Sequence, residues 1–363
     1  MIPLFAKYPN LRDNLPYVSV ADLPTPVARL ERLGAQLDIE LFVKRDDLTG
    51  KIYGGNKVRK LEFLLGKALQ EGRSEVITFG AVGSNHALAT AIYADQLGLG
   101  SINMLVPQPN AKYVRENLLM SHAIGAELHH YGNDWAAAVG TGVQMLSHKM
   151  RRGQFPAFIF IGGTTPYGML GFVNAALELE QQIAEGQMPV PDYIYVAMGS
   201  MGTSTGLAFG LRAAGLPTKV VPVRVVPDKY ASLKKFTRHW RKLQCLLAAE
   251  ETFATIGLGS EDYAIRDRFF GGEYARFTAE GQEAARRMWE AEGLNLEGTY
   301  TAKALAALID DANRGVLKGK TVLFWNTANS VDFSDSIAHL DYRELPAAFH
   351  RYFEEDLQPL DLK

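Results

Sequence analysis

The sequence has 363 residues, of which 47% are hydrophobic and 21% are charged, so the chain is long enough to bury a core in two domains or one large one. Its formal net charge of -2 excludes a strong non-specific attraction to nucleic acid or to an anionic membrane. The single cysteine, Cys245, excludes an intrachain disulfide and a cysteine-based metal site. Because there is neither a secretory signal nor an apolar run near the roughly 18 residues of a membrane span, we expect a cytoplasmic protein.

Short β-branched runs alternate with longer helical segments along most of the chain. This alternation is typical of parallel sheets covered by helices, so we predict an α/β fold with two mainly parallel sheets flanked by helices. The predicted strands are 40–43, 75–79, 101–106, 127–131, 157–161, 193–197, 219–226 and 321–325. The predicted helices are 57–71, 85–97, 113–124, 135–151, 168–185 and 203–214.

A glycine pair and a lysine mark the start of the first long helix, in the segment KRDDLTGKIYGGNKVRKLEFLL at 44–65. Lys57 lies near the helix N-terminus, where a lysine with a lowered pKa could act as a nucleophile toward an aldehyde and later as a base. In isolation, such a basic turn is usually a solvated helix face.

Two strand-to-helix turns carry groups that suit an anion. The segment FGAVGSNHALATAIY at 79–93 presents Ser84, Asn85 and His86 at a helix N-terminus, where backbone N–H groups bind anions; helix capping is the alternative. The segment YIYVAMGSMGTSTGLAFGL at 193–211 has a loop that could cradle a phosphate. A dinucleotide site is the rival interpretation, but the loop is not GxGxxG and no P-loop lysine follows it.

These motifs resemble the family of D-cysteine desulfhydrase and 1-aminocyclopropane-1-carboxylate (ACC) deaminase, which are fold-type II pyridoxal-phosphate (PLP) enzymes similar to the tryptophan synthase β-subunit. The GGNKxRKLE segment of that family carries the lysine that forms a Schiff base with PLP, so the resemblance gives this role to Lys57. It leaves Arg59 as a surface charge. The cofactor contacts that it implies are Lys57, Lys60, Asn85, Gly199, Ser200, Met201, Gly202, Thr203, Thr301 and Thr327.

The same resemblance identifies catalytic and substrate-binding residues. Tyr300, in LEGTYTAKALAALI at 296–309, and Tyr274, in GGEYARF at 271–277, correspond to active-site tyrosines. The implied catalytic residues are Lys57, Ser84, Tyr300 and Tyr274, and the implied substrate contacts are Ser84, Asn85, His86 and Thr164. The chain departs from the family at Gly83, where glutamine is usual, and at Met201, where glycine is usual.

Two hydroxyl residues bear on the reaction. The ACC deaminases of the family have a glutamate after the catalytic tyrosine and a leucine in the late strand, whereas this chain has Thr301 and Thr327. A hydroxyl does not favour a protonated pyridine nitrogen as a carboxylate does, and elimination of a good leaving group needs a weaker electron sink. We therefore expect β-elimination from a small D-amino acid, converting D-cysteine to pyruvate, sulfide and ammonia. ACC deamination and elimination from another β-substituted alanine, such as cysteate, are the alternatives.

The resemblance also predicts the organisation of the chain. Residues 1–52 and 161–363 would form a larger PLP-binding domain and residues 53–160 a smaller α/β domain, with the active site between them, and the family implies a homodimer. We expect no metal site, because no histidine pair has HExxH spacing. The C-terminal segment 331–363, which contains the amphipathic stretch ELPAAFHRYFEE, is interpreted as surface packing, with a cover for the site or a dimer contact as alternatives. A PLP-binding protein without turnover and a nucleotide-dependent α/β enzyme are the competing classes.

Overall fold

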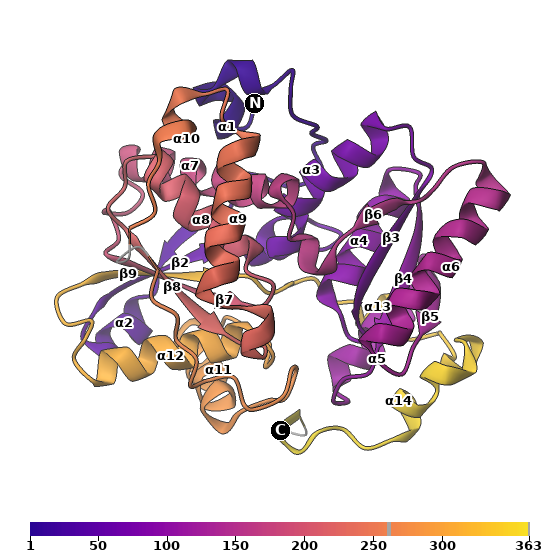
Figure 1. Cartoon of the computed structure of the whole chain (residues 1–363). Coiled ribbons are helices and arrows are strands. Elements are labelled where there is room, and N and C mark those ends of the chain that lie inside the picture. The colour runs from indigo at the N-terminus through magenta and orange to yellow at the C-terminus, as the bar shows by residue number, and fades with distance from the viewer. Residues whose placement is uncertain (260–262, 362–363) are drawn as a thin grey trace. The chain divides into compact units, whose positions relative to one another are not determined.

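The structure is a computed structural model that describes residues 1–259 and 263–361. Its chain divides into two compact units, each with its own sheet (Figure 1). Unit 1 comprises Met1–Leu15, Ala21–Lys60 and Thr164–Ser330, and unit 2 comprises Pro16–Val20, Leu61–Gly163 and Val331–Lys363. Within the described residues, no helix has the length and apolar character needed to cross a membrane.

Unit 1 is built on a five-stranded sheet. The strands follow the order β1 (Val27–Arg29), β2 (Glu40–Arg45), β9 (Thr321–Asn326), β7 (Tyr193–Met198) and β8 (Lys219–Arg224). Only the β1–β2 pair is antiparallel among these; the other neighbours run parallel, with Val43 opposite Phe324. The carboxyl ends of parallel strands meet at one edge of the sheet, so the loops after β2, β7 and β9 lie on the same side.

Helices cover both faces of this sheet, as expected when its strands are buried on both sides (Figure 1). On one face, α2 (Glu31–Leu37), α11 (Ala279–Glu292) and α12 (Thr301–Asn313) pack on a core that includes Val43, Tyr195 and Phe324. On the other face lie α7 (Pro166–Ala184), α8 (Gly202–Ala213) and α9 (Leu233–Leu246). Unit 1 also contains α1 (Pro3–Lys7) and α10 (Glu251–Thr255).

Unit 2 has a four-stranded parallel sheet. Its strands follow the order β5 (Glu127–His130), β4 (Gly100–Val106), β3 (Glu75–Ala81) and β6 (Ala157–Ile159). The helices α4 (Asn85–Gln96), α5 (Lys112–Ala123) and α6 (Asp134–Arg152) pack against it. Helix α3 (Asn56–Gln70) contributes its first five residues to unit 1 and the rest to unit 2.

All the predicted strands and helices are present, with ends within two residues of the expected positions, and the α/β fold with two mainly parallel sheets is confirmed. Elements outside the alternating pattern, among them β1, α2, α9 and α11, were not predicted. The central segment of unit 2 starts at Leu61, whereas residue 53 was expected, because the first turn of α3 belongs to unit 1.

The C-terminal segment packs on unit 2, whereas the sequence placed it with the larger domain. It forms the short helices α13 (Ser334–Ile337) and α14 (Arg351–Glu354). Phe349 and Tyr352 are buried, and the Tyr352 carbonyl accepts hydrogen bonds from the side chains of Asn110 (2.9 Å) and Arg115 (2.8 Å). These contacts agree with the surface packing that was predicted for the segment from its amphipathic pattern.

Candidate active site

The first turn of α3 joins the candidate lysine to the loop after β7. Lys57 Nζ donates to Asn56 Oδ1 at 2.9 Å, and Asn56 Nδ2 donates to Thr203 Oγ1 at 2.9 Å. Asn56 therefore fixes the Lys57 amine relative to the loop, which is a role that the sequence did not reveal. Gly55 has φ of +92°, and a side chain there would collide with the carbonyls of Thr327 and Ala328, so only glycine allows this approach.

Lys57 and Lys60 both lie where the charged form of an amine is disfavoured. Burial lowers the pKa of Lys57 to about 8, although the nearby Glu297 carboxylate raises it in part. Burial, and then the charge of Lys57, lower the pKa of Lys60 well below its usual value. An anion bound beside these amines would favour their charged forms, and a lysine with a lowered pKa is a competent nucleophile and base.

The Gly199–Thr203 loop follows β7 and leads into α8, whose N-terminal N–H groups favour an anion. A Cβ at Gly202 would lie 2.7 Å from Thr164 Oγ1 and 2.9 Å from Lys60 Nζ, so the loop, Thr164 and Lys60 line one small space. Thr164 Oγ1 also donates to Ser200 Oγ at 2.6 Å. The hydroxyls, N–H groups and amine gathered here fit a phosphate.

Met201 adopts a left-handed conformation with φ of +73° and ψ of -13°, which explains why glycine is usual at this position. Its side chain is buried, so packing offsets the backbone strain that a non-glycine residue has there. A methionine at this position leaves the backbone N–H in place.

Two tyrosines lie beside this loop. The hydroxyls of Tyr274 and Tyr300 are 2.5 Å apart, and Lys57 Nζ lies 5.7 Å from the centre of the Tyr300 ring. A Cβ on Gly199 would lie 3.4 Å from the Tyr300 ring, so the ring contacts the start of the loop. Burial raises the pKa of Tyr274 to about 12, opposed by the hydrogen bond with Tyr300 and reinforced by Glu297. Tyr274 is therefore protonated near neutral pH and can donate a hydrogen bond.

Glu297 is a carboxylate of the site that the sequence analysis missed. It accepts backbone hydrogen bonds from Thr299 (2.9 Å), Tyr300 (2.6 Å) and Thr301 (2.9 Å), and so caps the start of α12. Burial raises the pKa of Glu297, whereas these hydrogen bonds lower it. Its charge acts on Lys57 and Tyr274. The only signal in the sequence was an acidic residue four positions before a helical threonine.

Thr301 and Thr327 form different hydrogen bonds: Thr301 through its side-chain hydroxyl and Thr327 through its backbone carbonyl. Thr301 is buried, and its hydroxyl accepts from the Glu297 N–H (3.0 Å) and donates to the Glu297 carbonyl (3.3 Å). Thr327 follows β9, and its carbonyl accepts from the Asn56 N–H at 3.3 Å. The Thr301 hydroxyl is thus engaged in the start of α12, whereas Thr327 borders the first turn of α3.

Ser84, Asn85 and His86 lie in unit 2 at the start of α4. Ser84 caps the helix by accepting from the Ala87 N–H at 3.2 Å. Asn85 Oδ1 accepts from Asn117 Nδ2 at 3.0 Å, and His86 is buried. A Cβ at Gly83 would lie 2.7 Å from Val114 and 2.8 Å from Tyr113, which leaves no room there for the glutamine usual in the family.

Arg59 is not a surface charge, contrary to the expectation from the sequence. Its side chain is buried and pairs with Asp46 (2.7 Å) and Glu178 (2.9 Å). Lys44 Nζ binds the same Glu178 at 2.6 Å. This buried network holds the first turn of α3 against β2 and α7, on which the position of Lys57 depends.

Unit 1 therefore brings together most of the predicted site. Its gathered residues are Lys57, Lys60, Thr164, Gly199, Ser200, Met201, Gly202, Thr203, Tyr274, Tyr300, Thr301 and Thr327. The three remaining candidates, Ser84, Asn85 and His86, belong to unit 2.

Comparison with known proteins agrees with this geometry. Residues 18–328 match a family model described as pyridoxal-phosphate dependent enzyme. A Pyrococcus abyssi protein provisionally named 1-aminocyclopropane-1-carboxylate deaminase is 33% identical over 98% of this chain and 99% of its own. D-cysteine desulfhydrase from Klebsiella pneumoniae is 33% identical over 87% of this chain and 94% of its own.

Solved structures share the fold. The crystal structure of an ACC deaminase homologue has a TM-score of 0.74 and 32% identity, covering 93% of this chain and 98% of that one. Threonine deaminase isoform 2 from Solanum lycopersicum has a TM-score of 0.59 at 17% identity, covering 92% of this chain and 83% of that one. The second likeness concerns the fold alone.

Proposed function

Because the chain belongs to the family of pyridoxal-phosphate dependent enzymes, we propose that it catalyses β-elimination from a small D-amino acid, with D-cysteine converted to pyruvate, sulfide and ammonia. The observation that carries the proposal is the hydroxyl pair of Tyr274 and Tyr300 beside the Lys57 amine. A base and a proton donor are the two groups that removal of a Cα proton and departure of a Cβ substituent require.

Unit 1 would hold the cofactor. Lys57 is the residue for covalent attachment. The Gly199–Thr203 loop and Lys60 are the phosphate site, because Lys60 Nζ lies 2.9 Å from the position that a Cβ on Gly202 would occupy. Bound PLP supplies the electron sink that makes a Cα proton acidic. Of the two threonines, Thr327 is the better candidate to face the pyridine nitrogen, since the Thr301 hydroxyl is engaged with the Glu297 backbone.

The protein's own groups would then move protons. The Lys57 amine, with a pKa of about 8, accepts the Cα proton at mildly alkaline pH. Tyr300, supported by the hydrogen bond from Tyr274, donates toward the leaving group. Substrate recognition is proposed for Thr164 and, in unit 2, for the α4 N-terminus with Ser84, Asn85 and His86, where N–H groups and the helix dipole favour a carboxylate.

ACC deamination is the second candidate, since a 33%-identical relative is provisionally named for it and a structural neighbour is titled an ACC deaminase homologue. Position 301 favours elimination instead, because the residue after Tyr300 is a threonine engaged in helix capping and not a carboxylate. Elimination of a thiolate needs a weaker electron sink than opening a cyclopropane ring. Other β-substituted alanines, such as cysteate, would use the same groups.

A single set of assays tests the proposal. The purified protein and Lys57→Ala are compared for visible absorbance after PLP addition, and then for products from D-cysteine, L-cysteine, cysteate and ACC. Sulfide and pyruvate from D-cysteine, absent in the variant, would support the assignment. Turnover of ACC to 2-oxobutyrate alone would favour the second candidate, and a Lys57-independent spectrum would reject the site.

A further inference from the structure

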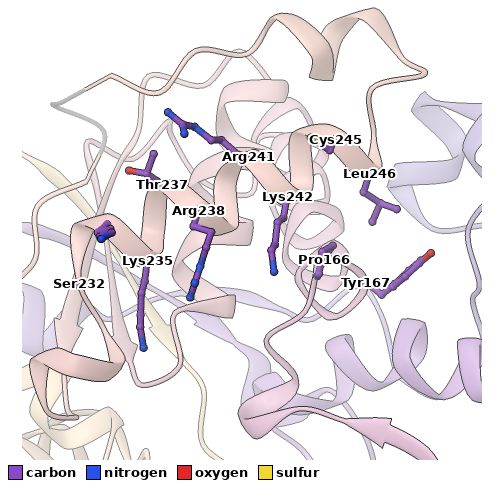
Figure 2. A pocket seen from close by; sticks show the side chains of 11 residues that line it. Pro166, Tyr167, Ser232, Lys235, Thr237, Arg238, Arg241, Lys242, Cys245 and Leu246 are labelled. Carbon is purple, nitrogen blue, oxygen red and sulfur yellow. The ribbon is translucent and has the colours of Figure 1, made fainter.

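A pocket of about 1190 Å³ opens beside α9 (Figure 2). It is formed by α9 and by the first turn of α7, both in unit 1. Neither Lys57 nor the Gly199–Thr203 loop lines it. The lining residues are Pro166, Tyr167, Ser232, Lys234, Lys235, Thr237, Arg238, Arg241, Lys242, Cys245 and Leu246.

Five of the lining residues are cationic and none is acidic. Lys235, Arg238 and Lys242 have i, i+3, i+7 spacing, and Figure 2 shows them pointing to the same side of α9. None of the five forms an ion pair with a described carboxylate, and Asp228, just before α9, pairs with Arg224. Lys235 Nζ lies 5.6 Å from the Tyr230 ring centre. Neighbouring like charges destabilise a helix, and no described carboxylate pairs with these five cations. A bound anion would supply the missing counter-charge.

His239 reports the positive potential from within the same helix. Burial, and then the charges of Arg238, Lys242, Lys235 and Lys60, together lower the pKa of His239 to about 4. Its Nδ1 is buried and has no hydrogen-bond partner in the described part of the chain. The positive potential that contributes to this lowered pKa would also attract an anion.

The first turn of α7 contributes a second source of positive potential and an apolar end. Thr165 caps this 19-residue helix by accepting from the Gly168 N–H at 3.2 Å, so Pro166 and Tyr167 lie at the positive end of its dipole. Pro166 and Tyr167 lie near the Lys242 end of the cationic row in Figure 2, and Leu246 follows on α9. The pocket is therefore cationic along one side and apolar or aromatic at one end.

The size of the pocket helps to choose among anions. Ligand pockets of about 300–1,000 Å³ hold molecules of drug size, so this one exceeds the needs of a small amino acid or a single phosphate. Cations at spacings of three and four residues can bind several anionic groups at once. An aromatic and apolar end suits a ring system joined to those groups.

We propose that this pocket is a second ligand site, which binds a small molecule carrying several phosphate groups joined to an aromatic ring, that is, a nucleoside polyphosphate. The site is independent of the cofactor and goes beyond the proposed lyase activity. Phosphates bind Lys235, Arg238 and Lys242, and the ring packs toward Pro166 and Tyr167.

The test measures binding of ATP, inorganic tripolyphosphate and adenosine to the PLP-saturated holoenzyme by isothermal titration calorimetry at constant ionic strength. Saturation with PLP keeps the probes from the cofactor phosphate site. The variant is Arg238→Ala with Lys242→Ala. The matched control, Lys219→Ala with Lys318→Ala, removes two exposed charges from other parts of unit 1.

We expect saturable 1:1 ATP binding, weaker binding of tripolyphosphate and least of adenosine. The α9 variant should bind ATP at least about tenfold more weakly, since each charge-assisted hydrogen bond contributes about that factor, whereas the control should not change. Equal losses in both double variants would indicate non-specific charge attraction and overturn the proposal, as would non-saturable binding or tight binding of adenosine alone. The cofactor spectrum is recorded separately, so failure of the lyase assignment is distinguishable from failure of this site.

Discussion

The hydroxyls of Tyr274 and Tyr300 lie 2.5 Å apart although 26 positions separate the residues in the chain. Two interactions bring them together. Glu297 caps the start of α12 at Tyr300, and Lys303, one turn later, donates to the Phe270 carbonyl at 2.8 Å, which anchors the loop that carries Tyr274. Helix α12 thus positions both phenols, one directly and the other through its buried lysine.

Replacing Tyr300 by phenylalanine should lower kcat by roughly 10²–10⁴-fold, because the proton donor is lost, with a smaller change in KM. Tyr274→Phe should cost about tenfold, since it removes only the hydrogen bond that orients Tyr300. Steady-state kinetics with D-cysteine measure both effects, and the visible cofactor spectrum should persist in each variant.

Tyr193→Phe is the matched control. Tyr193 begins β7, whereas the loop that contacts Tyr300 follows the other end of that strand, roughly 17 Å away at about 3.3 Å per residue. Its kinetics should equal those of the unmodified protein. If Tyr300→Phe behaved like this control, the tyrosine pair would not take part in the reaction.

Glu297→Gln should shift cofactor attachment toward lower pH. The Glu297 carboxylate raises the pKa of Lys57 against the effect of burial, so removing its charge lowers that pKa below about 8 and increases the neutral amine at pH 7. The measurement is the rate at which the visible band appears when PLP is added to apoprotein across pH 6–10. A midpoint unchanged from the parent protein would show that Glu297 does not act on Lys57.

Glu297→Ala separates charge from capping. The single amide oxygen of glutamine can still accept from the Tyr300 and Thr301 N–H groups and loses only the bond from Thr299, whereas alanine accepts none of the three. The alanine variant should therefore lose roughly 1–3 kcal/mol in the free energy of unfolding, and the glutamine variant less. Denaturant unfolding of the two variants distinguishes them.

Contiguous motifs made part of this site predictable. Lys57 follows a glycine pair at the start of a helix, and the Gly199–Thr203 loop joins a strand to a helix, so each is specified by neighbours in the chain. The alternating strands and helices likewise specify both sheets. Such local signals require no knowledge of what packs on them.

Residues whose roles depend on distant partners were not predictable. A basic helical turn usually faces solvent, and the burial of Arg59 becomes evident only when Asp46 and Glu178 approach from other elements. Glu297 was not predicted, because its effect on Lys57 acts across 240 positions in the chain. Helix α9 did carry a readable signal, since Phe236, Trp240 and Leu243 recur at helical spacing and are buried.

Gly202→Ala should weaken PLP binding by at least about tenfold. The added Cβ would lie 2.7 Å from Thr164 Oγ1 and 2.9 Å from Lys60 Nζ, in the space proposed for the phosphate, and a lost charge-assisted hydrogen bond alone accounts for that factor. Equilibrium titration with PLP measures the change.

The matched control is Gly142→Ala, within α6, where the new methyl group would meet nothing within 4 Å. That substitution should leave PLP affinity unchanged and stabilise the helix by up to about 1 kcal/mol. Equal PLP affinity in the two variants would place the phosphate elsewhere.

Acid should destabilise unit 1 through Glu178. Burial alone would raise the pKa of this carboxyl group, but the charges and hydrogen bonds of Arg59 and Lys44 outweigh it and hold the pKa at about 2. Since the folded pKa lies below the unfolded value of about 4.5, the stabilisation is complete above pH 4.5 and disappears as the pH falls toward 2. The contribution is roughly 3 kcal/mol, at 1.36 kcal/mol per pKa unit.

Urea unfolding between pH 6 and pH 2.5 measures this dependence. Glu178→Gln removes the titrating group, so it should be less stable at pH 6, because Lys44 and Arg59 lose a buried counter-charge, and should show a shallower loss of stability in acid. Glu180→Gln, two residues along α7, is the matched control: its pair with Lys7 is partly exposed, so the pH dependence should match that of the parent protein. Parallel curves for Glu178→Gln and the parent protein would mean that the buried network under α3 does not depend on the charge of Glu178.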